Sequence, residues 1–343
     1  MHYAFLNIAK EAYNPFKIDS DPHLTQSAQY GSWQEILGKK VFHFELRDEK
    51  SDLVITGQYI AYPLIKGYTY WYAPYGPVVN SETSPEAIER FLAGVKEAAK
   101  KHHAIFVRSE LPQKYNYKEV VPFISKSSYT QERCEWIIDA KQTIEDILKN
   151  MEQKTRYNVR LAEKKNLTVT IEKETISDTS KAIFLTLMED TARRNGFRLH
   201  EDGYYETIFN NLNREKNGAV VIILKDNIPL AINLLVKTGE TVHYLFGGSS
   251  DEHKNLMGSY LVHLESIKVT KSWGAHWYSF GAVNKHDDSK NALSGITHFK
   301  KRFGGMYREH GFIVDEIINN KIYLAYTFYK LLSVLKRKLF SKL

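Results

Sequence analysis

The sequence predicts an α/β (α+β) protein in which one sheet-and-helix domain occurs twice. Each half of the chain carries strand patterns, then a helix pattern, then another strand pattern. Short connections join these patterns, as is typical of mixed sheets flanked by helices. Equivalent points are evenly spaced, because Gly76 and Gly248 are 172 residues apart, as are Arg108 and Phe280, in a chain of 343 residues. We therefore expect an internal duplication.

In the first half, residues 53–64 and 68–74 are rich in Tyr, Ile, Val and Trp with alternating polarity, which predicts two strands joined by a turn at Lys66-Gly67. A helix is expected over 84–101, because Ser84 can cap it and Pro85 suits its first turn. The apolar run over 103–112 predicts a buried strand after this helix.

The second half repeats this order. Residues 218–246 predict three strands, with turns at Asp226-Asn227 and Gly239-Glu240. A helix over 255–274 and a strand over 276–283 follow. The two halves therefore share one sequence of elements.

Between the halves, residues 144–165 predict one long amphipathic helix. Its apolar positions recur every three or four residues, and Lys149, Gln153, Arg156, Arg160 and Lys164 follow the same spacing on another face. Such a basic stripe indicates either a solvated helix surface or a contact with a polyanion. We expect Thr155, Val159 and Ala162 to pack on the body of the protein.

The formal net charge of +7 and the pI of about 9.0 favour polyanionic partners, although solubility alone can also explain them. The single cysteine, Cys134, excludes an internal disulfide. No Cys/His spacing typical of zinc occurs, so no metal site is predicted. No apolar run approaches the roughly 20 residues that span a bilayer. We expect a cytoplasmic monomer.

The segment 319–343 predicts a basic amphipathic helix, with a Leu/Phe/Tyr face and the cations Lys330, Lys336, Arg337, Lys338 and Lys342. It could lie peripherally on the anionic inner membrane face. The favoured alternative is a terminal helix packed on the body with a solvated basic side.

The sequence indicates no cofactor. The acetyl-CoA loop of N-acetyltransferases is basic-x-x-Gly-x-Gly/Ala, which binds pyrophosphate at a helix N-terminus. Lys254, Met257 and Ser259 occupy its three positions here, so both glycines are missing. A P-loop, a G-x-S-x-G elbow and an H-E-x-x-H motif are also absent from the sequence.

Three motifs carry a resemblance to a known family. They are "YAPYGPVV" at 72–79, "KTRYNVRLAEKKN" at 154–166, and "SFGAV" at 279–283 followed by "ITHFKKRFGG" at 296–305. Together and in this order they resemble the Fem family of peptidoglycan-bridge aminoacyltransferases. The resemblance implies two tandem GNAT-like domains, 1–145 on the precursor-binding side and 146–318 on the aminoacyl-tRNA side. No heptad run occurs between 181 and 218, so the chain resembles members without a coiled-coil arm.

The resemblance also implies the reaction. Family members transfer an amino acid from aminoacyl-tRNA to the stem peptide of a UDP-linked or lipid-linked peptidoglycan precursor. Two other readings stay open: a GNAT-fold transferase with a protein N-terminus or a lipid as acceptor, and a non-catalytic basic RNA-binding module.

Site residues follow from the same resemblance. Lys300, preceded by Phe299, matches the lysine implicated near the reacting ester. Precursor binding is implied for Lys39 or Lys40, for Tyr72 and Tyr75, and for Arg198 or His200, with Arg198 preferred because guanidinium binds phosphate bidentately. The sequence departs from its relatives at Tyr75, where a basic residue is common. The expected tRNA contacts are Lys154, Arg156, Arg160, Lys164, Lys301 and Arg302. Asp287 or Asp288 could act as general base, with deprotonation assisted by the substrate as the alternative.

Overall fold

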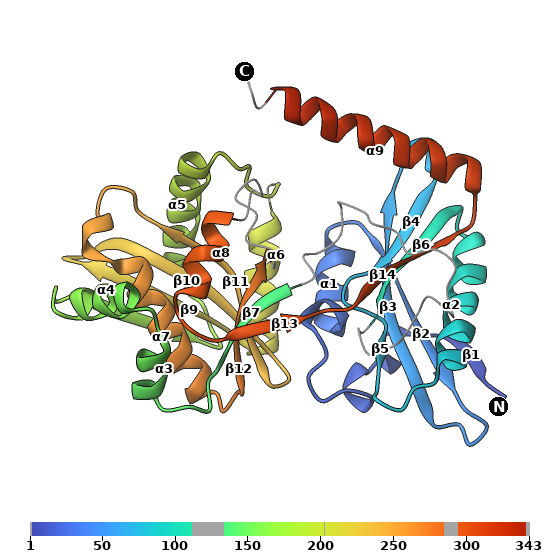
Figure 1. Ribbon diagram of the computed structural model, residues 1–343, viewed down its shortest axis with the longest axis horizontal. Helices are drawn as coiled ribbons and strands as arrows, with labels where there is room; N and C mark the ends of the chain where they lie inside the picture. The colour runs from blue at the N-terminus through green and yellow to red at the C-terminus, as the bar shows by residue number, and fades with distance from the viewer. Residues whose placement is uncertain (1, 112–133, 202, 285–293, 341–343) are drawn as a thin grey trace. The chain divides into compact units, whose positions relative to one another are not determined.

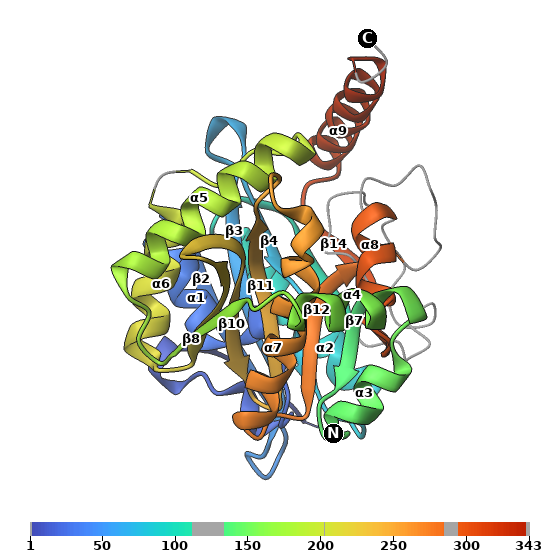
Figure 2. The ribbon, with the colours of Figure 1, turned by 90° about the vertical axis from the view of Figure 1, so that its left-hand side faces the viewer.

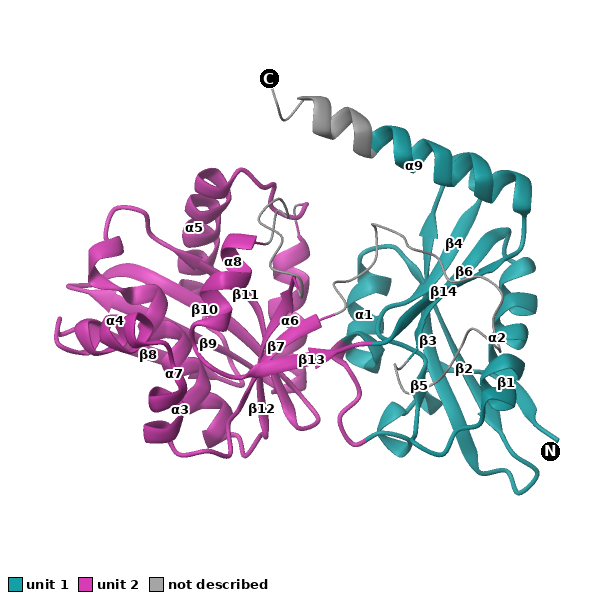
Figure 3. Cartoon of the chain, viewed as in Figure 1, with its two compact units in different colours: residues 1–19, 25–130, 311–343 teal, residues 20–24, 131–310 magenta. Residues whose placement is uncertain are grey.

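The computed structural model describes residues 2–111, 134–201, 203–284 and 294–340, with side chains up to residue 333 (Figure 1). The chain forms two compact units (Figure 3). Unit 1 comprises residues 1–19, 25–130 and 311–343, and unit 2 comprises residues 20–24 and 131–310. No helix within the described ranges has both the length and the apolar content that a membrane crossing requires.

Unit 1 contains a sheet with the strand order β1-β2-β3-β4-β6-β14, in which β5 pairs with β3 off this path. Its strands are β1 (Ala4–Ile8), β2 (Lys40–Arg47), β3 (Leu53–Pro63), β4 (Thr69–Ala73), β5 (Val78–Val79), β6 (Ala104–Leu111) and β14 (Phe312–Ile317), and its helices are α1 (Ala28–Ile36), α2 (Pro85–Lys100) and α9 (Asn320–Phe340). The helix α2 begins as predicted, because Ser84 accepts a hydrogen bond from the N–H of Ala87. Its Ile88, Phe91 and Val95 are buried in one core with Trp71 of β4.

Unit 2 contains a sheet with the strand order β13-β7-β12-β11-β10-β9-β8 (Figure 2). Its strands are β7 (Cys134–Asp139), β8 (Thr168–Lys173), β9 (Gly218–Lys225), β10 (Ile228–Thr238), β11 (Thr241–Ser249), β12 (Trp277–Val283) and β13 (Met306–Glu309), and its helices are α3 (Ile144–Asn150), α4 (Gln153–Glu163), α5 (Asp178–Asn195), α6 (Tyr204–Glu215), α7 (Gly258–Ser272) and α8 (Ser294–Lys301). Helices cover both faces. Val221 and Ile223 share a core with residues of α3, α4 and α7, whereas α5 and α6 contact β9, β10 and β11. Alternation along β9 turns the buried Val220 and Ile222 to the other face.

The two sheets repeat one topology, which confirms the predicted mixed α/β fold and supports the duplication. In unit 1 the parallel pair β4 and β6 is connected by α2, and in unit 2 the parallel pair β11 and β12 is connected by α7. Every other paired neighbour among the described strands is antiparallel. The predicted strands of both halves are present, and 181–218 holds α5 and α6 rather than a coiled-coil arm.

Each sheet contains one strand that directly follows the elements of the other unit in the chain. The strand β7 follows the first-half elements but pairs with β12, and β14 follows β13 but pairs with β6. The units consequently divide at 130/131 and 310/311 instead of at the predicted 145 and 318. A local pattern of apolar residues identifies a strand without identifying its partner.

The predicted long helix over 144–165 is two helices. Met151 and Glu152 are extended between α3 and α4, with ψ of 149° and 146°. Tertiary contacts fix this break, since the N–H of Glu152 donates to the carbonyl of Arg302 at 2.9 Å. The predicted packing face is confirmed, because Thr155, Val159 and Ala162 are buried.

Candidate active site

The parallel strands β11 and β12 separate in the middle of the unit 2 sheet. They pair only where Thr241 to His243 lie opposite Trp277 to Ser279, although β11 continues to Ser249. Beyond this point β12 contains Gly281, whose φ of 72° favours glycine. The pairing of β12 with β7 also shifts between Ser279 and Ala282. The separation exposes backbone groups of β12 to side chains of other elements.

Lys300 of α8 contacts the backbone of β12 where β11 and β12 have separated. Its side chain is only 6% exposed, and Nζ donates to the carbonyl of Ala282 at 2.8 Å. Burial lowers the pKa of Lys300 from its usual 10.5 to about 8, against an opposing effect of the Glu135 carboxylate. A buried amine with this pKa is mainly a cation at neutral pH and loses its proton slightly above it.

Phe299 and His263 form an aromatic wall beside this lysine. The ring of Phe299 lies 5.6 Å from that of His263 and 5.3 Å from that of Tyr260. Nδ1 of His263 lies 3.1 Å from the amide nitrogen of Asn233, which can only donate, and 2.8 Å from the hydroxyl of Tyr278. Nδ1 therefore accepts and Nε2 carries the proton. Burial and the charge of Lys300 lower the pKa of His263 to about 3, so it stays neutral.

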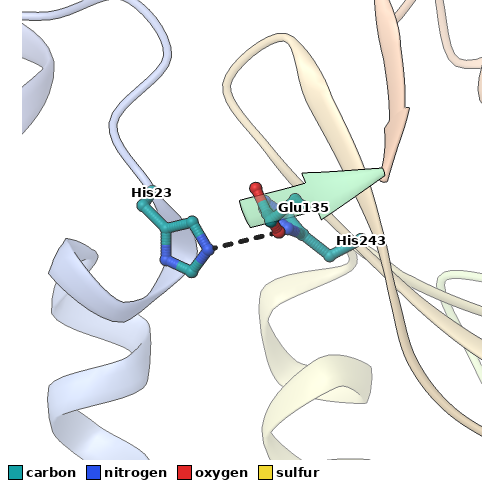
Figure 4. A group of neighbouring side chains, drawn as sticks. All are labelled: His23, Glu135 and His243. Atoms are coloured by element: carbon teal, nitrogen blue, oxygen red, sulfur yellow. Dashed lines mark ion pairs between the residues drawn. The ribbon is translucent and has the colours of Figure 1, made fainter. Parts of the chain in front are cut away.

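Glu135 of β7 lies next in the same sheet and is almost fully buried. Its Oε1 accepts a hydrogen bond from the hydroxyl of Ser279 at 2.9 Å, and its Oε2 lies 2.9 Å from Nε2 of His310. Nε2 of His23 is 3.6 Å from Oε1, and His243 completes the group (Figure 4). Although burial favours the protonated acid, interactions with His23 and His310 hold the pKa of Glu135 well below its usual value.

The residues predicted to bind the precursor on the first-domain side all lie in unit 1. Nζ of Lys39 donates to Oε1 of Gln34 at 2.6 Å and lies 4.9 Å from the centre of the Tyr62 ring. Desolvation lowers the pKa of Lys39, whereas Lys40 is exposed at the start of β2. Tyr72 is buried and donates to the carboxylate of Glu110, and Tyr75 has a positive φ of 50° in the loop after β4. Of these four residues, Lys40 is the exposed cation.

Arg198 and His200 lie in the segment between α5 and α6, and both are exposed. The His200 ring stacks on Tyr204 at 3.9 Å and lies 5.8 Å from Phe246 of β11. His200 is therefore fixed on an aromatic surface, while Arg198 extends from the same segment.

The basic residues of α4 divide into two kinds. Lys154, Arg160 and Lys164 are exposed. Arg156 instead binds the C-terminal carbonyls of α3, because Nη1 donates to Met151 at 2.7 Å and to Lys149 at 3.0 Å. A guanidinium at a helix C-terminus satisfies carbonyls that lack intrahelical donors. Arg156 thus has a structural role that the predicted tRNA contact did not include.

Lys301 and Arg302 follow the candidate catalytic lysine. Lys301 lies 5.4 Å from the centre of the Tyr307 ring. Nη2 of Arg302 lies 2.7 Å from Nε2 of His298, and its Nε is 3.4 Å from Glu152. These contacts hold the two side chains beside the C-terminal end of α8. Asp287 and Asp288, the candidate general bases, lie outside the described residues.

Sequence reasoning did not identify Glu135, His263 or the histidines around Glu135. No spacing rule could find them, because His23, Glu135, His243 and His310 come from four distant segments. Glu135 lies in the short apolar stretch of β7, which the sequence analysis did not identify as a strand.

Comparisons with known proteins agree with this architecture. The model of the FemAB family matches residues 8–135, 122–223 and 221–332. The aminoacyltransferase FemA of Staphylococcus aureus is 22% identical over 414 aligned positions, covering 94% of this chain and 97% of FemA.

Two solved structures show the same fold. The crystal structure of FemX superposes with a TM-score of 0.80 at 20% identity, covering 94% of this chain and 99% of FemX. A tandem GNAT protein from the clavulanic acid biosynthesis pathway superposes with a TM-score of 0.55 at 8% identity, covering 92% and 98%. These likenesses confirm two GNAT-like units in tandem.

Proposed function

The chain belongs to the FemAB family, and from that premise we propose that it is an aminoacyltransferase that builds the interpeptide bridge of peptidoglycan. It moves an amino acid from aminoacyl-tRNA to the stem peptide of UDP-MurNAc-pentapeptide or lipid II. The observation that carries this proposal is the position of Lys300, buried where β11 and β12 separate and bonded to the carbonyl of Ala282. By the family resemblance, this is also the lysine expected near the reacting ester.

The reaction needs positioning and charge stabilisation more than activation. The stem-peptide amine attacks the ester carbonyl, a C–N bond forms, and the C–O bond to the tRNA ribose breaks. The proton lost by the amine is balanced by the proton gained by the ribose hydroxyl. The ester is already activated, so this step requires no ATP and no cofactor.

In this reaction Lys300 stabilises the oxyanion of the tetrahedral intermediate. A buried cation acts strongly on a charge that develops nearby, because little water screens it. Phe299 lines the acyl site together with His263, whose ring lies 5.6 Å away. The neutral His263 adds no second positive charge that would raise the energetic cost of burying Lys300.

Phosphates of the two substrates need cations on each unit. For the precursor we propose Lys39 or Lys40 together with Tyr72 and Tyr75 in unit 1, and Arg198 or His200 in unit 2. For tRNA we propose the exposed Lys154, Arg160 and Lys164 of α4, with Lys301 and Arg302 at the end of α8. Arg156 contributes mainly by fixing the start of α4. We propose that the protein acts as a cytoplasmic monomer.

We also propose that α9 lies on the inner membrane face, where lipid-linked precursor resides. Tyr326 of α9 packs 5.4 Å from Phe106 of β6, and Tyr323 packs 5.1 Å from the same ring. The opposite side is apolar rather than simply basic, since Leu324, Phe328 and Leu331 are 66%, 62% and 56% exposed. Such a side favours an interface over bulk water.

The transferase proposal is tested by incubating the full chain with charged tRNA and UDP-MurNAc-pentapeptide, and separately with lipid II, followed by mass spectrometry. We expect the stem peptide to gain the mass of one aminoacyl residue. Unchanged masses of both precursors with all charged tRNAs would refute it. Retained tRNA binding would then favour the RNA-binding module, and transfer to another amine would favour a different acceptor.

The membrane proposal is tested by sedimentation with phosphatidylglycerol vesicles. Phe328→Ser/Leu331→Ser should release the protein from these vesicles. The matched control is Ile65→Ser, which changes an 82% exposed apolar residue of the same unit. Equal sedimentation of both variants would contradict a role for α9.

A further inference from the structure

We propose that His23, Glu135 and His243 bind one divalent transition-metal ion, with zinc as the best match. Each residue offers one ligand atom, and these atoms all lie within 4.8 Å of one another. Figure 4 shows the three side chains converging from a loop, from β7 and from β11. All three belong to unit 2, so this site is complete within one compact unit.

One separation within the group is close to that of two ligands on a single metal ion. Nε2 of His23 lies 3.6 Å from Oε1 of Glu135, which is long for a hydrogen bond. Two ligands bound tetrahedrally at about 2.1 Å from zinc are roughly 3.4 Å apart. The three ligand atoms, which lie within 4.8 Å of one another, would approach this separation when they bind one ion.

His243 supplies the second, independent observation. It is 6% exposed, and its Nε2 has no hydrogen-bond partner among the described residues. A buried polar atom without a partner is destabilising, so a native structure normally satisfies it. A metal ion bound to Nε2 would satisfy this atom.

The donor set also matches the chemistry of zinc. The group offers two imidazole nitrogens and one carboxylate oxygen. Zinc binds His nitrogen and Asp or Glu oxygen, commonly with three protein ligands.

An outer layer of contacts orients the carboxylate. Ser279 donates to Oε1 of Glu135 at 2.9 Å, and Nε2 of His310 lies 2.9 Å from Oε2. Hydrogen bonds of this kind commonly fix metal-binding side chains. The nearby cation Arg308 is partly compensated by Asp21, 3.5 Å away. His310 belongs to this outer layer through its contact with Oε2 of Glu135.

Such an ion would fasten the segment 20–24 to the unit 2 sheet. Asp21 in that segment already accepts hydrogen bonds from the N–H of Glu240 and the hydroxyl of Thr241. The ion would add a coordinate link from the same segment to β7 and β11. We assign it a structural role, separate from the transfer chemistry at Lys300.

The test uses the full chain, freed of any polyhistidine tag, stripped with a chelator and then titrated with Zn²⁺. Elemental analysis after desalting should find one zinc per chain, and Co²⁺ should give the absorption of a tetrahedral site. His23→Gln and His243→Asn should each lose this binding. His276→Gln is the matched control, because His276 lies in unit 2 beside Asp139 and outside the cluster.

Substoichiometric zinc in the folded wild-type chain would overturn the proposal in favour of a metal-free hydrogen-bonded cluster. Unchanged binding in a folded His23→Gln protein would overturn it as well. Circular dichroism establishes that each variant is folded, and His23→Gln serves if His243→Asn is not. The readout is metal content, so failure of the proposed transferase function would leave this result unaffected.

Discussion

Each sheet is completed by a strand that carries a buried acid, and the two units surround this acid differently. In unit 1, β14 places Asp315 against Arg108 of β6, with both carboxylate oxygens 2.6 Å from guanidinium nitrogens. In unit 2, β7 places Glu135 among a hydroxyl and imidazoles, with the charge of Lys300 nearby. A buried ion pair mainly secures a fold, whereas a buried carboxylate among imidazoles offers the donor set of a metal site.

The parallel strand pairs of the two units also differ. In unit 1, β4 pairs with β6 up to its last residue, Ala73, although the register shifts between Thr69 and Trp71. The loop that follows is also tied down, because the N–H of Glu110 donates to the carbonyl of Gly76 at 2.7 Å. In unit 2, β11 and β12 separate after His243, and Lys300 binds beyond that point. The duplicated fold has thus kept one closed copy and one open copy.

The largest expected effect is on the closed copy. Arg108→Met leaves Asp315 buried beside an apolar side chain, and both residues of the original pair are at most 2% exposed. Removing one partner of a buried ion pair costs about 3–5 kcal/mol. We expect unit 1 to unfold at clearly lower denaturant concentration, measured by urea titration with fluorescence and circular dichroism.

The control for this loss is Lys96→Met in the same unit. Lys96 pairs with Glu316 at 3.2 Å, but both side chains are partly exposed. An exposed pair contributes about 0–1 kcal/mol, so the midpoint should hardly move. Equal losses in the two variants would show that the Arg108–Asp315 pair has no special structural weight.

The second effect concerns the open copy. Lys300→Met should reduce transfer about 10²–10³-fold while the protein stays folded, because removal of one group that stabilises an oxyanion has this magnitude. Initial rates with charged tRNA measure it. Lys268→Met, which alters a partly exposed lysine paired with Glu265, should keep the wild-type rate. Near-normal turnover of Lys300→Met would remove this lysine from the mechanism.

The third effect is a pH dependence of stability that we expect from Lys300 in the open copy and not from Arg108 in the closed copy. The pKa of Lys300 is about 8 in the folded protein and 10.5 in the unfolded chain, so between these values the unfolded state binds more protons. The free energy of unfolding therefore rises with pH across this window. Below pH 8 the buried charge is destabilising by roughly 3 kcal/mol, so Lys300→Met should be more stable than wild type there. This advantage should vanish near pH 10.5.

The transfer rate should change with pH in the opposite direction to stability. A cationic Lys300 loses its charge above pH 8, so the transfer rate of the bound complex should decline there. Lys300→Arg, if folded, should lose that decline because guanidinium does not titrate in this range. Arg108 likewise keeps its charge, so the closed copy contributes no such profile. Identical pH profiles for wild type and Lys300→Arg would assign the decline to another group.

The sequence predicted what local patterns and motifs encode. The alternation over 53–64 and the cap at Ser84 reappear in β3 and α2. The break at Met151 was missed, since no Pro or Gly marks it and the carbonyl of Arg302 helps to fix it. The exchange of β7 and β14 and the cluster around Glu135 were missed for a similar reason. Both depend on partners far away in sequence.

The smallest expected effect is on tRNA binding by α4, where one arginine is bound within the protein and another is exposed. Arg156 is bound to α3 carbonyls, whereas Arg160 is exposed. Arg160→Ala should weaken tRNA binding a few-fold and reduce the salt slope by about 1, the effect of one phosphate contact. Arg156→Ala should mainly lower stability, by roughly 1–2 kcal/mol.

Filter binding at several salt concentrations measures tRNA affinity, and urea unfolding measures stability. The control is Arg214→Ala, because that arginine pairs with Glu215 at 3.0 Å. If Arg160→Ala kept the wild-type salt slope, α4 would be a solvated helix face, because its exposed cations would then lack a polyanionic partner.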